Sequence, residues 1–401
     1  MHIILVCREY IGSSRGGGIG SYMQEIARAY VKMGHKVTIV TASDDTRREY
    51  QLTTDDGLNI ISLSGGDFLV EKAEGRSKLK KLRCLYRFHS YRRKLRSVLK
   101  SILDADIVEV ADYGAESLYL SDLDIPVVVR LHTPQSLSRA TLSVVKPKWW
   151  QIYRTIPLRA EKKIFERTRY ITACSQSVLD WVGAHFDISK AHATVINNPV
   201  ALPTAQQMAK NESAKSPKVI FYAGTICETK GVRDLIDACK LLKAQGLDIR
   251  LKLAGKGGSF QMALQKEVED HHWTWVEFLG LLSREKIYEN YANADVCCFP
   301  SWWENMPMVC LESMARGAIV VSTNAGGTSE IITNGYNGFL TDRKNPDRLA
   351  DTLEKALCLN ERERQMISEN AVNTIKEHFS TEVIAGKMLK YFQKVKEDFE
   401  K

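Results

Sequence analysis

Two carboxylates in the stretch Phe299–Gly317 have the types and spacing to do chemistry. Pro307 is favoured at a first helical position and Gly317 suits a helix end, so we expect a helix with Glu304 before it and Glu312 inside it. Free backbone N–H groups at the start of this helix can bind an anion. Apolar neighbours of Glu312 disfavour a plain surface helix. We therefore expect two separate ligand contacts, one to sugar hydroxyls and one to a ribose diol.

The same two carboxylates could instead form the acid pair of a glycosidase. The helical rise of about 1.5 Å per residue would place Glu304 and Glu312 about 12 Å apart, whereas such pairs lie roughly 5 to 9.5 Å apart. The separation shrinks if Glu304 folds back from its loop. Two ligand contacts fit the spacing better than a hydrolytic pair.

Three glycine-containing loops before predicted helices are suited to phosphate. The first, Gly16–Gly20, lets the backbone approach a phosphate at a helix N-terminus. The second runs from Gly224 to Gly231 and carries Lys230, whose charge suits a diphosphate leaving group. The third is Asn324–Glu330. Each loop could instead be a glycine turn without a ligand, and Lys230 a solvated surface lysine. Three such loops favour phosphate binding more than one loop would.

His132 follows the predicted strand 127–131 directly. Ligands of open parallel sheets bind beyond the carboxyl ends of the strands, so a polar side chain at this position can enter a ligand cleft. A lone histidine is more often structural. We therefore assign His132 to a ligand site only because the other motifs also lie after strands.

Strands and helices alternate along the chain and must position these residues. Short apolar runs predict buried strands in the first half at 3–7, 37–41, 107–110, 127–131 and 170–173, and in the second half at 219–223, 249–254, 276–279, 296–300, 319–322 and 338–340. Helical patterns separate them. This alternation predicts α/β domains with parallel sheets and crossover helices.

The domain boundary is predicted where the pattern stops. A polar stretch with three prolines forms a linker at 199–217, between a first domain at 1–198 and a second at 218–378. Two such domains facing each other would place a site in the cleft between them. The chain ends in an amphipathic helix from Thr381 onward.

Composition indicates a globular cytoplasmic protein. The 401 residues exceed the usual size of one domain, about 100 to 200 residues. Hydrophobic content of 44% and charged content of 26% exclude disordered and fibrous classes. No apolar run reaches the roughly 18 residues of a membrane span, and the first residues resemble a buried strand rather than a signal peptide. The nine cysteines lack zinc-like spacing and fit a reducing compartment.

The positive charge is concentrated in residues 76–100. This segment holds eleven Lys and Arg and no acid, so the net charge of +8 leaves the rest of the chain at 8 − 11 = −3. Its apolar residues have near-helical spacing. Such a helix could bind an anionic membrane or a phosphorylated acceptor, or it could be a solvated helix packed on the first domain. The first alternative would make the protein peripheral at the inner face of the cell membrane. Nucleic acid is not an expected partner, because no recognition module accompanies the charge.

Two Asp-x-Asp sequences have the form of a metal-binding motif. They are Asp104-Ala105-Asp106 and Asp122-Leu123-Asp124. Both precede predicted strands, which is the wrong end of a sheet for a site. We interpret them as turn residues.

Together these motifs resemble the retaining nucleotide-sugar glycosyltransferases of family four, a large group with the GT-B fold. The resemblance covers nearly the whole chain, and the stretch Ser301–Gly327 is its most specific part. The matching features occur in the family's order: the glycine loop, His132, 172–177, 195–198, Lys230-Gly231, Glu304 with Glu312, and Gly326-Gly327.

The resemblance implies two Rossmann-like domains, with residues 379–401 packing back on the first and the donor bound mostly by the second. It implies transfer with retention of configuration, no metal and no cofactor, because the nucleotide sugar is a substrate. Carried over to this sequence, the catalytic residues are His132, Glu304 and Lys230. The implied donor contacts are Gly17, Gly18, Gly224, Thr225, Lys230, Gly280, Leu281, Glu304, Asn305, Met306, Pro307, Met308 and Glu312.

The sequence departs from the family pattern at two places. Thr225 stands where many members have an arginine, so half of the usual cationic pair on the diphosphate is missing; Arg233 is a candidate replacement. The common Glu-Gly-Phe-Gly is here Glu304-Asn305-Met306-Pro307, which keeps the glutamate and reshapes the sugar pocket.

The expected activity is transfer of a hexose or N-acetylhexosamine, from a UDP-sugar first and GDP-mannose second, to a glycan, lipid-linked or small-molecule acceptor in surface polysaccharide or glycoconjugate biosynthesis. A non-catalytic nucleotide-sugar-binding subunit of a transferase complex is one alternative, which only Thr225 favours. A dinucleotide-dependent oxidoreductase is another. It is disfavoured because Ser21 stands where the fingerprint needs glycine or alanine and no acid ends the second strand before Asp44.

Overall fold

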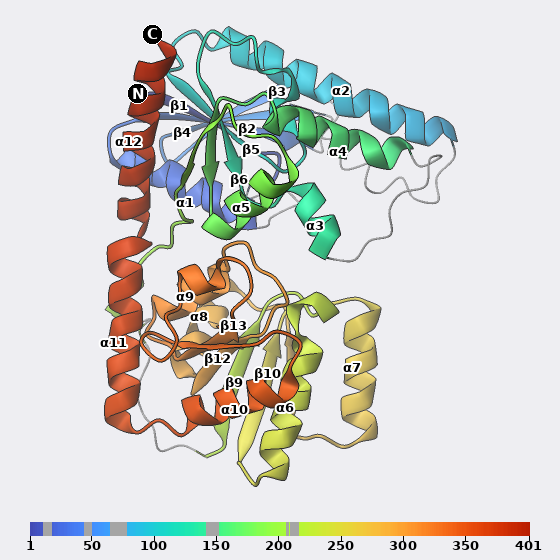
Figure 1. Ribbon diagram of the computed structural model, residues 1–401, viewed down its shortest axis with the longest axis vertical. Coiled ribbons are helices and arrows are strands. Elements are labelled where there is room, and N and C mark those ends of the chain that lie inside the picture. The colour runs from blue at the N-terminus through green and yellow to red at the C-terminus, as the bar shows by residue number, and fades with distance from the viewer. Residues whose placement is uncertain (11–17, 44–49, 65–77, 142–151, 206–207, 209–215) are drawn as a thin grey trace. The chain divides into compact units, whose positions relative to one another are not determined.

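The computed structural model describes residues 1–10, 18–43, 50–64, 78–141, 152–205, 208 and 216–401. It divides into two compact units, drawn in Figure 1. The first comprises Met1–Pro199 with Thr381–Lys401, and the second comprises Val200–Ser380. Each unit is a mostly parallel sheet flanked by helices, so the predicted α/β fold class with two parallel-sheet domains is confirmed.

The first unit is built on an eight-stranded sheet in the order β3-β4-β2-β1-β5-β6-β7-β8. Its neighbouring strands are parallel, except that β3 and β4 form an antiparallel pair. The strands are β1 (His2–Val6), β2 (Lys36–Ser43), β3 (Tyr50–Asp55), β4 (Leu58–Ser64), β5 (Ile107–Ala111), β6 (Val127–Leu131), β7 (Tyr170–Ala173) and β8 (His192–Val195).

Helices cover both faces of this sheet. They are α1 (Gly18–Lys32), α2 (Lys78–Ser101), η2 (Glu116–Tyr119), α3 (Gln135–Thr141), α4 (Ile152–Phe165), α5 (Gln176–His185) and α12 (Thr381–Phe399). Ile3 and Leu5 of β1 point to a core formed with α1 and α12, whereas Ile4 and Val6 point to a core formed with α2. Successive strand residues point to opposite faces of the sheet, so α1 and α12 cover one face and α2 covers the other. Met388 and Phe392 are fully buried in the first core, so α12 packs back on the first unit.

Residues 78–100 of the basic segment lie in helix α2, drawn in cyan in Figure 1, which packs on the core that contains Ile4 and Val6. Arg92 is fully buried, donates to the backbone carbonyls of Phe88 and Ala115, and lies over the Phe88 ring. Arg96 and Lys100 both bond to Asp122. These contacts favour a helix packed on the first unit. Within the described residues, no helix is both long and apolar enough to cross a membrane.

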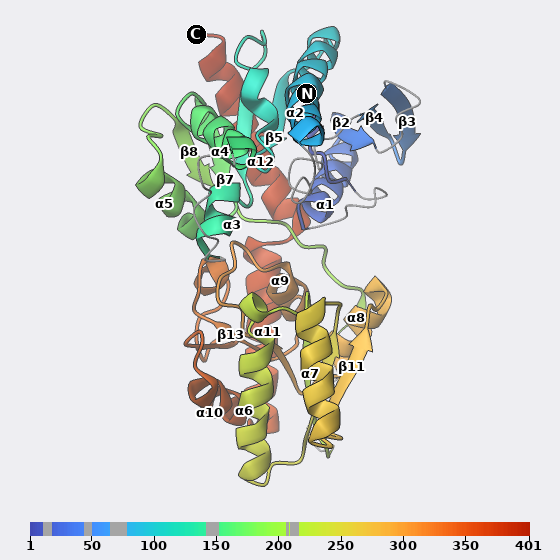
Figure 2. The same ribbon diagram turned by 90° about the vertical axis from the view of Figure 1, so that its right-hand side faces the viewer.

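The second unit carries a six-stranded parallel sheet in the order β11-β10-β9-β12-β13-β14. The strands are β9 (Lys218–Ala223), β10 (Ile249–Ala254), β11 (Val276–Gly280), β12 (Val296–Phe299), β13 (Val320–Thr323) and β14 (Phe339–Thr341). The helices are η5 (Glu228–Lys230), α6 (Val232–Ala244), α7 (Ser259–Asp270), α8 (Arg284–Asn293), α9 (Met308–Met314), η6 (Gly327–Glu330), α10 (Pro346–Leu357) and α11 (Glu361–His378). Figure 2 shows α6 and α7 side by side, where Arg233 and Glu267 form an ion pair of 2.5 Å.

The sequence patterns located most of these strands but missed three. Strands β3, β4 and β8 were not predicted. The turn between β3 and β4 is Asp56-Gly57, with φ of 45° and 80°. An Asp-Gly pair between two strand-like runs is a strong hairpin signal, so the sequence did contain the evidence for this pair. Strand β8 is a short edge strand whose first two residues are exposed, which weakens its apolar pattern.

Candidate active site

Lys230 and Glu304 meet at the carboxyl end of the second sheet. Lys230 ends η5, in the loop after β9, and Glu304 lies in the loop after β12, which is the strand beside β9. The Lys230 Nζ lies 2.5 Å from the Glu304 Oε1, and the Ser301 hydroxyl donates to the same oxygen at 2.8 Å. Both charged side chains are partly buried. The structure thus joins two residues that the sequence placed 74 positions apart.

Two glycines allow the backbone to close around this pair. Gly231 has a φ of 67°, and a Cβ there would lie 1.9 Å from the carbonyl oxygen of Pro300. Gly326 has a φ of 66°, and its Cβ would lie 2.0 Å from the carbonyl oxygen of Glu304. The amide of Gly327 donates to that same carbonyl at 2.9 Å. Only glycine fits such approaches, so both residues fix the position of the Glu304 loop.

Two tryptophans brace the Glu304 loop. The Trp302 indole N–H donates to Asp234 at 2.8 Å, near the start of α6, and its backbone N–H donates to the Thr229 carbonyl. The Trp303 indole donates to the Asn305 side chain at 2.8 Å. Trp302 therefore ties the loop to η5 and α6, and Trp303 bonds within the loop. The sequence analysis assigned neither tryptophan to the site.

The helix predicted after Glu304 is α9, which begins at Met308 with Pro307 as its N-cap. The structure thus places Pro307 one position before the predicted one, and Gly317 lies beyond the helix, which ends at Met314. Met306 and Pro307 are buried, whereas Asn305 and Met308 are half-buried. The two glutamates have different partners, because Glu312 lies 3.7 Å from the Arg284 guanidinium rather than near Lys230. The separate ligand contacts of Glu304 and Glu312 stay a prediction.

Glycine backbones also join the ends of β9, β10 and β11. The Gly224 amide donates to Ala254, and the Gly255 amide donates to Gly280 at 2.8 Å. A Cβ at Gly255 would lie 1.8 Å from the Gly224 carbonyl oxygen. Thr225 and Leu281 follow these strand ends and are exposed, Leu281 by 72%. They lie at the edge where a ligand of a parallel sheet binds.

The sequence analysis missed the loop Gly255-Lys256-Gly257-Gly258, which follows β10 at this same edge. A Cβ at Gly257 would lie 2.1 Å from the Ile226 carbonyl oxygen, and the Ile226 amide donates to the Lys256 carbonyl. The signal was available, because the loop repeats the glycine-after-strand pattern. Arg233, the candidate replacement for the missing arginine, is ion-paired with Glu267.

In the first unit, the start of α1 and His132 are linked through Tyr22. Gly18 begins α1 and is exposed, whereas Gly17 lies outside the described residues. The rings of Tyr22 and His132 meet edge to face at 4.7 Å. His132 follows β6 directly, as predicted, and is 4% exposed. The structure thereby brings the helix after the glycine loop against the histidine.

A buried charge network keeps His132 neutral. The Arg130 guanidinium lies over the Tyr22 ring at 4.2 Å and donates to the Ile196 carbonyl at 2.9 Å. The Tyr22 hydroxyl donates to Glu109 at 2.9 Å. Burial, and next the charge of Arg130, hold the pKa of His132 well below its usual range. His132 is therefore suited to hydrogen bonding rather than to carrying a charge.

Asp112 is a further residue that the sequence analysis missed. It follows β5 directly, so it carries the same post-strand signal that identified His132. One Asp112 carboxylate oxygen accepts from the amides of His132, at 3.0 Å, and Thr133, at 3.4 Å. Burial raises the pKa of Asp112 from 3.8 to about 7, with Glu161 adding to the rise and the backbone bonds opposing it.

Asp112 should make the stability of the protein depend on pH. Between pH about 4 and about 7 the native carboxyl holds a proton that the unfolded chain has lost, so stability falls as pH rises, by up to about 4 kcal/mol. Asp112→Asn removes this titration. We expect its melting temperature to fall less between pH 5 and pH 8 than that of the unaltered protein. The control is Asp124→Asn, an exposed change; equal pH profiles for all three proteins would contradict the assignment.

The two Asp-x-Asp sequences lie at the end of the first sheet opposite to Asp112 and His132. They precede β5 and β6, at the opposite ends of these strands from Asp112 and His132. Asp104 bonds to Lys36 and Asp106 to Lys396, while Asp122 bonds to Arg96 and Lys100. These contacts support their interpretation as structural turn residues.

Comparison with known proteins gives matches over nearly the whole chain. The model of Glycosyltransferase Family 4 matches residues 16–202, and the model of Glycosyl transferases group 1 matches residues 203–374. An uncharacterised glycosyltransferase of Methanocaldococcus jannaschii is 31% identical over 37% of this chain and 41% of its own length. The D-inositol 3-phosphate glycosyltransferase of Paenarthrobacter aurescens is 24% identical over 86% of each chain.

Solved structures agree in fold. Sucrose-phosphate synthase from Thermosynechococcus elongatus has a TM-score of 0.77 at 16% identity, covering 98% of each chain. Anabaena HepE in complex with UDP has a TM-score of 0.72 at 18% identity, covering 98% of this chain and all of HepE. The fold, the loops at the strand ends and the family matches together define a glycosyltransferase with the GT-B fold. The chain belongs to the GT-B nucleotide-sugar glycosyltransferases, with a family 4 domain followed by a group 1 domain.

Proposed function

We propose that this glycosyltransferase moves a hexose or N-acetylhexosamine from a UDP-sugar to a glycan, lipid-linked or small-molecule acceptor, with retention of configuration and without a metal. The observation that carries the proposal is the Lys230–Glu304 pair of 2.5 Å, placed at the carboxyl end of a parallel sheet and fixed by two glycines. The UDP complex of HepE supports UDP as the nucleotide. The pathway proposed for the product is surface polysaccharide or glycoconjugate biosynthesis.

In this proposal Lys230 neutralises the charge that develops on the diphosphate as the sugar leaves. Glu304, beside it, accepts hydrogen bonds from hydroxyls of the donor sugar, and the backbone amides of 305–308 meet the sugar or phosphate at the start of α9. Glu312 bonds the ribose diol, and Gly280 with Leu281 contacts the base. Fixed charges that need no rearrangement during the reaction would supply much of the catalysis.

For the first unit, the proposal assigns roles to His132 and Gly18. His132 offers a neutral ring near the reacting centre, because burial and Arg130 disfavour its charged form. The start of α1 lies against the diphosphate, since free N–H groups at a helix N-terminus attract anions. The acceptor then attacks the face of the sugar from which the nucleotide leaves.

We also propose a cytoplasmic location for the reaction. The cysteines that the structure describes are free thiols, among them the half-buried Cys227 and the exposed Cys358. Free thiols at accessible positions fit a reducing compartment.

Nucleotide binding tests the proposal. At a free concentration of 100 times Kd, a ligand stabilises the protein by about 2.7 kcal/mol, which raises the melting temperature by roughly 5 to 10 °C. We expect this shift with UDP and not with NAD, and GDP and ADP are tested in parallel. The Glu312→Ala variant should lose the shift. Stabilisation by NAD alone, or by none of the four, would refute the proposed donor site. If UDP stabilises the protein but sugar transfer stops when a chelator is present, catalysis is not independent of a metal.

A further inference from the structure

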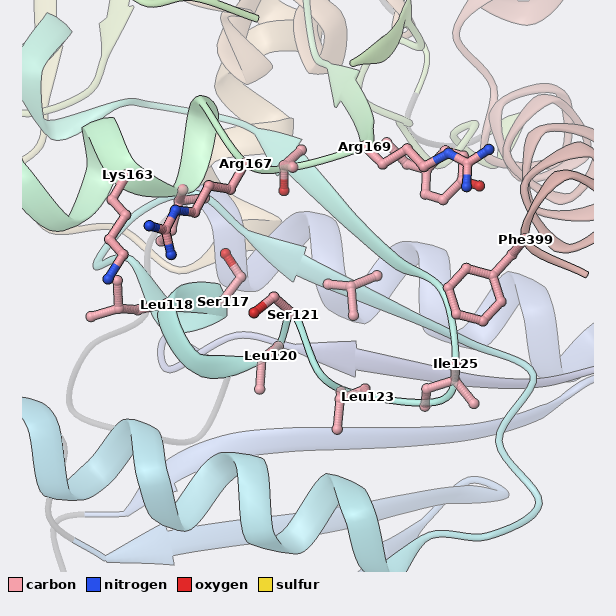
Figure 3. A pocket seen from close by; sticks show the side chains of 14 residues that line it. Ser117, Leu118, Leu120, Ser121, Leu123, Ile125, Lys163, Arg167, Arg169 and Phe399 are labelled. Atoms are coloured by element: carbon pink, nitrogen blue, oxygen red, sulfur yellow. The ribbon is translucent and has the colours of Figure 1, made fainter. Parts of the chain in front are cut away.

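A cavity lies in the first unit at the end of the sheet where β6 and β7 begin. It measures about 250 Å³ and is shown in Figure 3. Val127 and Tyr170, the first residues of these strands, belong to its lining. His132 follows the other end of β6, five residues further along. At about 3.3 Å per strand residue the two places are about 16 Å apart, so the cavity is separate from His132 and the strand end beside it.

One end of the cavity is cationic. Lys163, in the last turn of α4, and Arg167, just after that helix, lie together at this end in Figure 3. Both are exposed, and neither has an ion-pair partner among the residues that the structure describes. Arg169, at the other end, is already paired with Asp398 at 2.9 Å. Lys163 and Arg167 are therefore available to an anionic ligand.

The rest of the lining is amphipathic. Hydroxyl groups of Ser117, Ser121 and Thr168 contribute to the cavity and can donate hydrogen bonds to further oxygen atoms of an anion. Ile125 and Phe399 line the opposite end in Figure 3, and Phe399 is 39% exposed. A ligand that covers this ring removes apolar surface from water, which is favourable.

We propose that this cavity binds an amphipathic phosphate monoester, with its phosphate at Lys163 and Arg167 and its apolar body against Ile125 and Phe399. A phosphate monoester carries up to two negative charges, which match two cations, and its three oxygens accept from the guanidinium, the ammonium and the hydroxyls. Since a cavity of about 150 Å³ holds benzene, 250 Å³ suits a ligand of about ten non-hydrogen atoms. A carboxylate offers fewer acceptors and should bind more weakly.

Hexyl phosphate is the probe, titrated calorimetrically into the whole chain with and without saturating UDP. We expect binding that UDP does not displace. Lys163→Gln and Arg167→Gln should each weaken it about tenfold, because each removes a charged hydrogen-bond donor. Lys162→Gln is the matched control, since Lys162 is a neighbouring α4 lysine paired with Glu166 outside the lining, and should leave the affinity unchanged.

A filling variant tests the cavity independently of charge. Ser121 is exposed, so Ser121→Trp should fold, which its melting temperature checks, and should abolish hexyl phosphate binding. Vesicles of phosphatidylcholine with or without phosphatidic acid distinguish a lipid headgroup from a free metabolite as the source of the monoester. Either source supports the proposal if Lys163→Gln and Arg167→Gln weaken binding. Displacement by UDP, equal binding of hexanoate, no binding, or affinities unchanged in the variants would each overturn it.

Discussion

Lys230→Met is expected to lower kcat for sugar transfer by about 10²- to 10³-fold, the usual effect of removing one group that stabilises charge in a transition state. The family resemblance implies an arginine where this chain has Thr225, so in the proposed site Lys230 should carry most of the cationic contact to the diphosphate. Methionine keeps the length and apolar stem of the side chain. Initial rates at saturating donor measure the effect.

The matched control for this change is Lys266→Met. Lys266 is a surface lysine paired with Asp270 on α7, and we expect full activity there. Lys230→Met also leaves Glu304 without its ion-pair partner, so melting temperatures must show that the variant still folds. A kcat within about twofold of the unaltered enzyme would show that Lys230 does not stabilise the leaving group.

The fold could be predicted because the buried strands are short apolar runs separated by helical patterns. Such runs identify strands buried on both faces, as β1 and β12 are. The method missed the edge strand β3 and its neighbour β4, which mix polar with apolar residues. Their Asp56-Gly57 turn was the better signal.

From the sequence, the residues of the candidate site could be predicted only from their positions directly after strands, and not from their contacts with one another. This rule located His132, Lys230 and Glu304, and applied consistently it would also have found Asp112 and the loop at 255–258. Periodicity could not reveal the pairing of Lys230 with Glu304. That contact depends on how two adjacent strands in the sheet are ordered, and strand order is not encoded in either local segment.

The network behind His132 was beyond sequence reasoning for a similar reason. Tyr22 and Glu109 are 87 residues apart, and Arg130 reaches carbonyls 66 residues away. A tyrosine in a helix gives no local sign that it will be buried against charged residues in distant strands. Charged residues are rarely fully buried without partners, so Glu109 and Arg130 within apolar strands were the one available hint.

Gly326→Ala is expected to lower both stability and activity, because the Cβ meets backbone rather than a side chain that can move. Gly326 has a φ of 66° and a ψ of −137°, a region that essentially only glycine adopts, so alanine there costs roughly 1 to 3 kcal/mol. Forcing a Cβ to 2.0 Å from the Glu304 carbonyl oxygen adds strain of about 1 to 3 kcal/mol or more. The loop can relieve this strain only by moving Glu304, and with it the ion pair with Lys230. Thermal melting and transfer rates measure the two effects.

Gly335→Ala measures the cost of a positive φ without a close backbone contact. Gly335 has a φ of 76°, and a Cβ there meets no atom within 4 Å. This variant should lose only the conformational part of the stability and keep its activity. If Gly326→Ala behaves like Gly335→Ala in both measurements, the close approach at Glu304 does not constrain the loop. If Gly326→Ala loses activity far beyond its loss of stability, the position of Glu304 is what the glycine maintains, since a misplacement of about 1 Å in an active site can cost 10²-fold in rate.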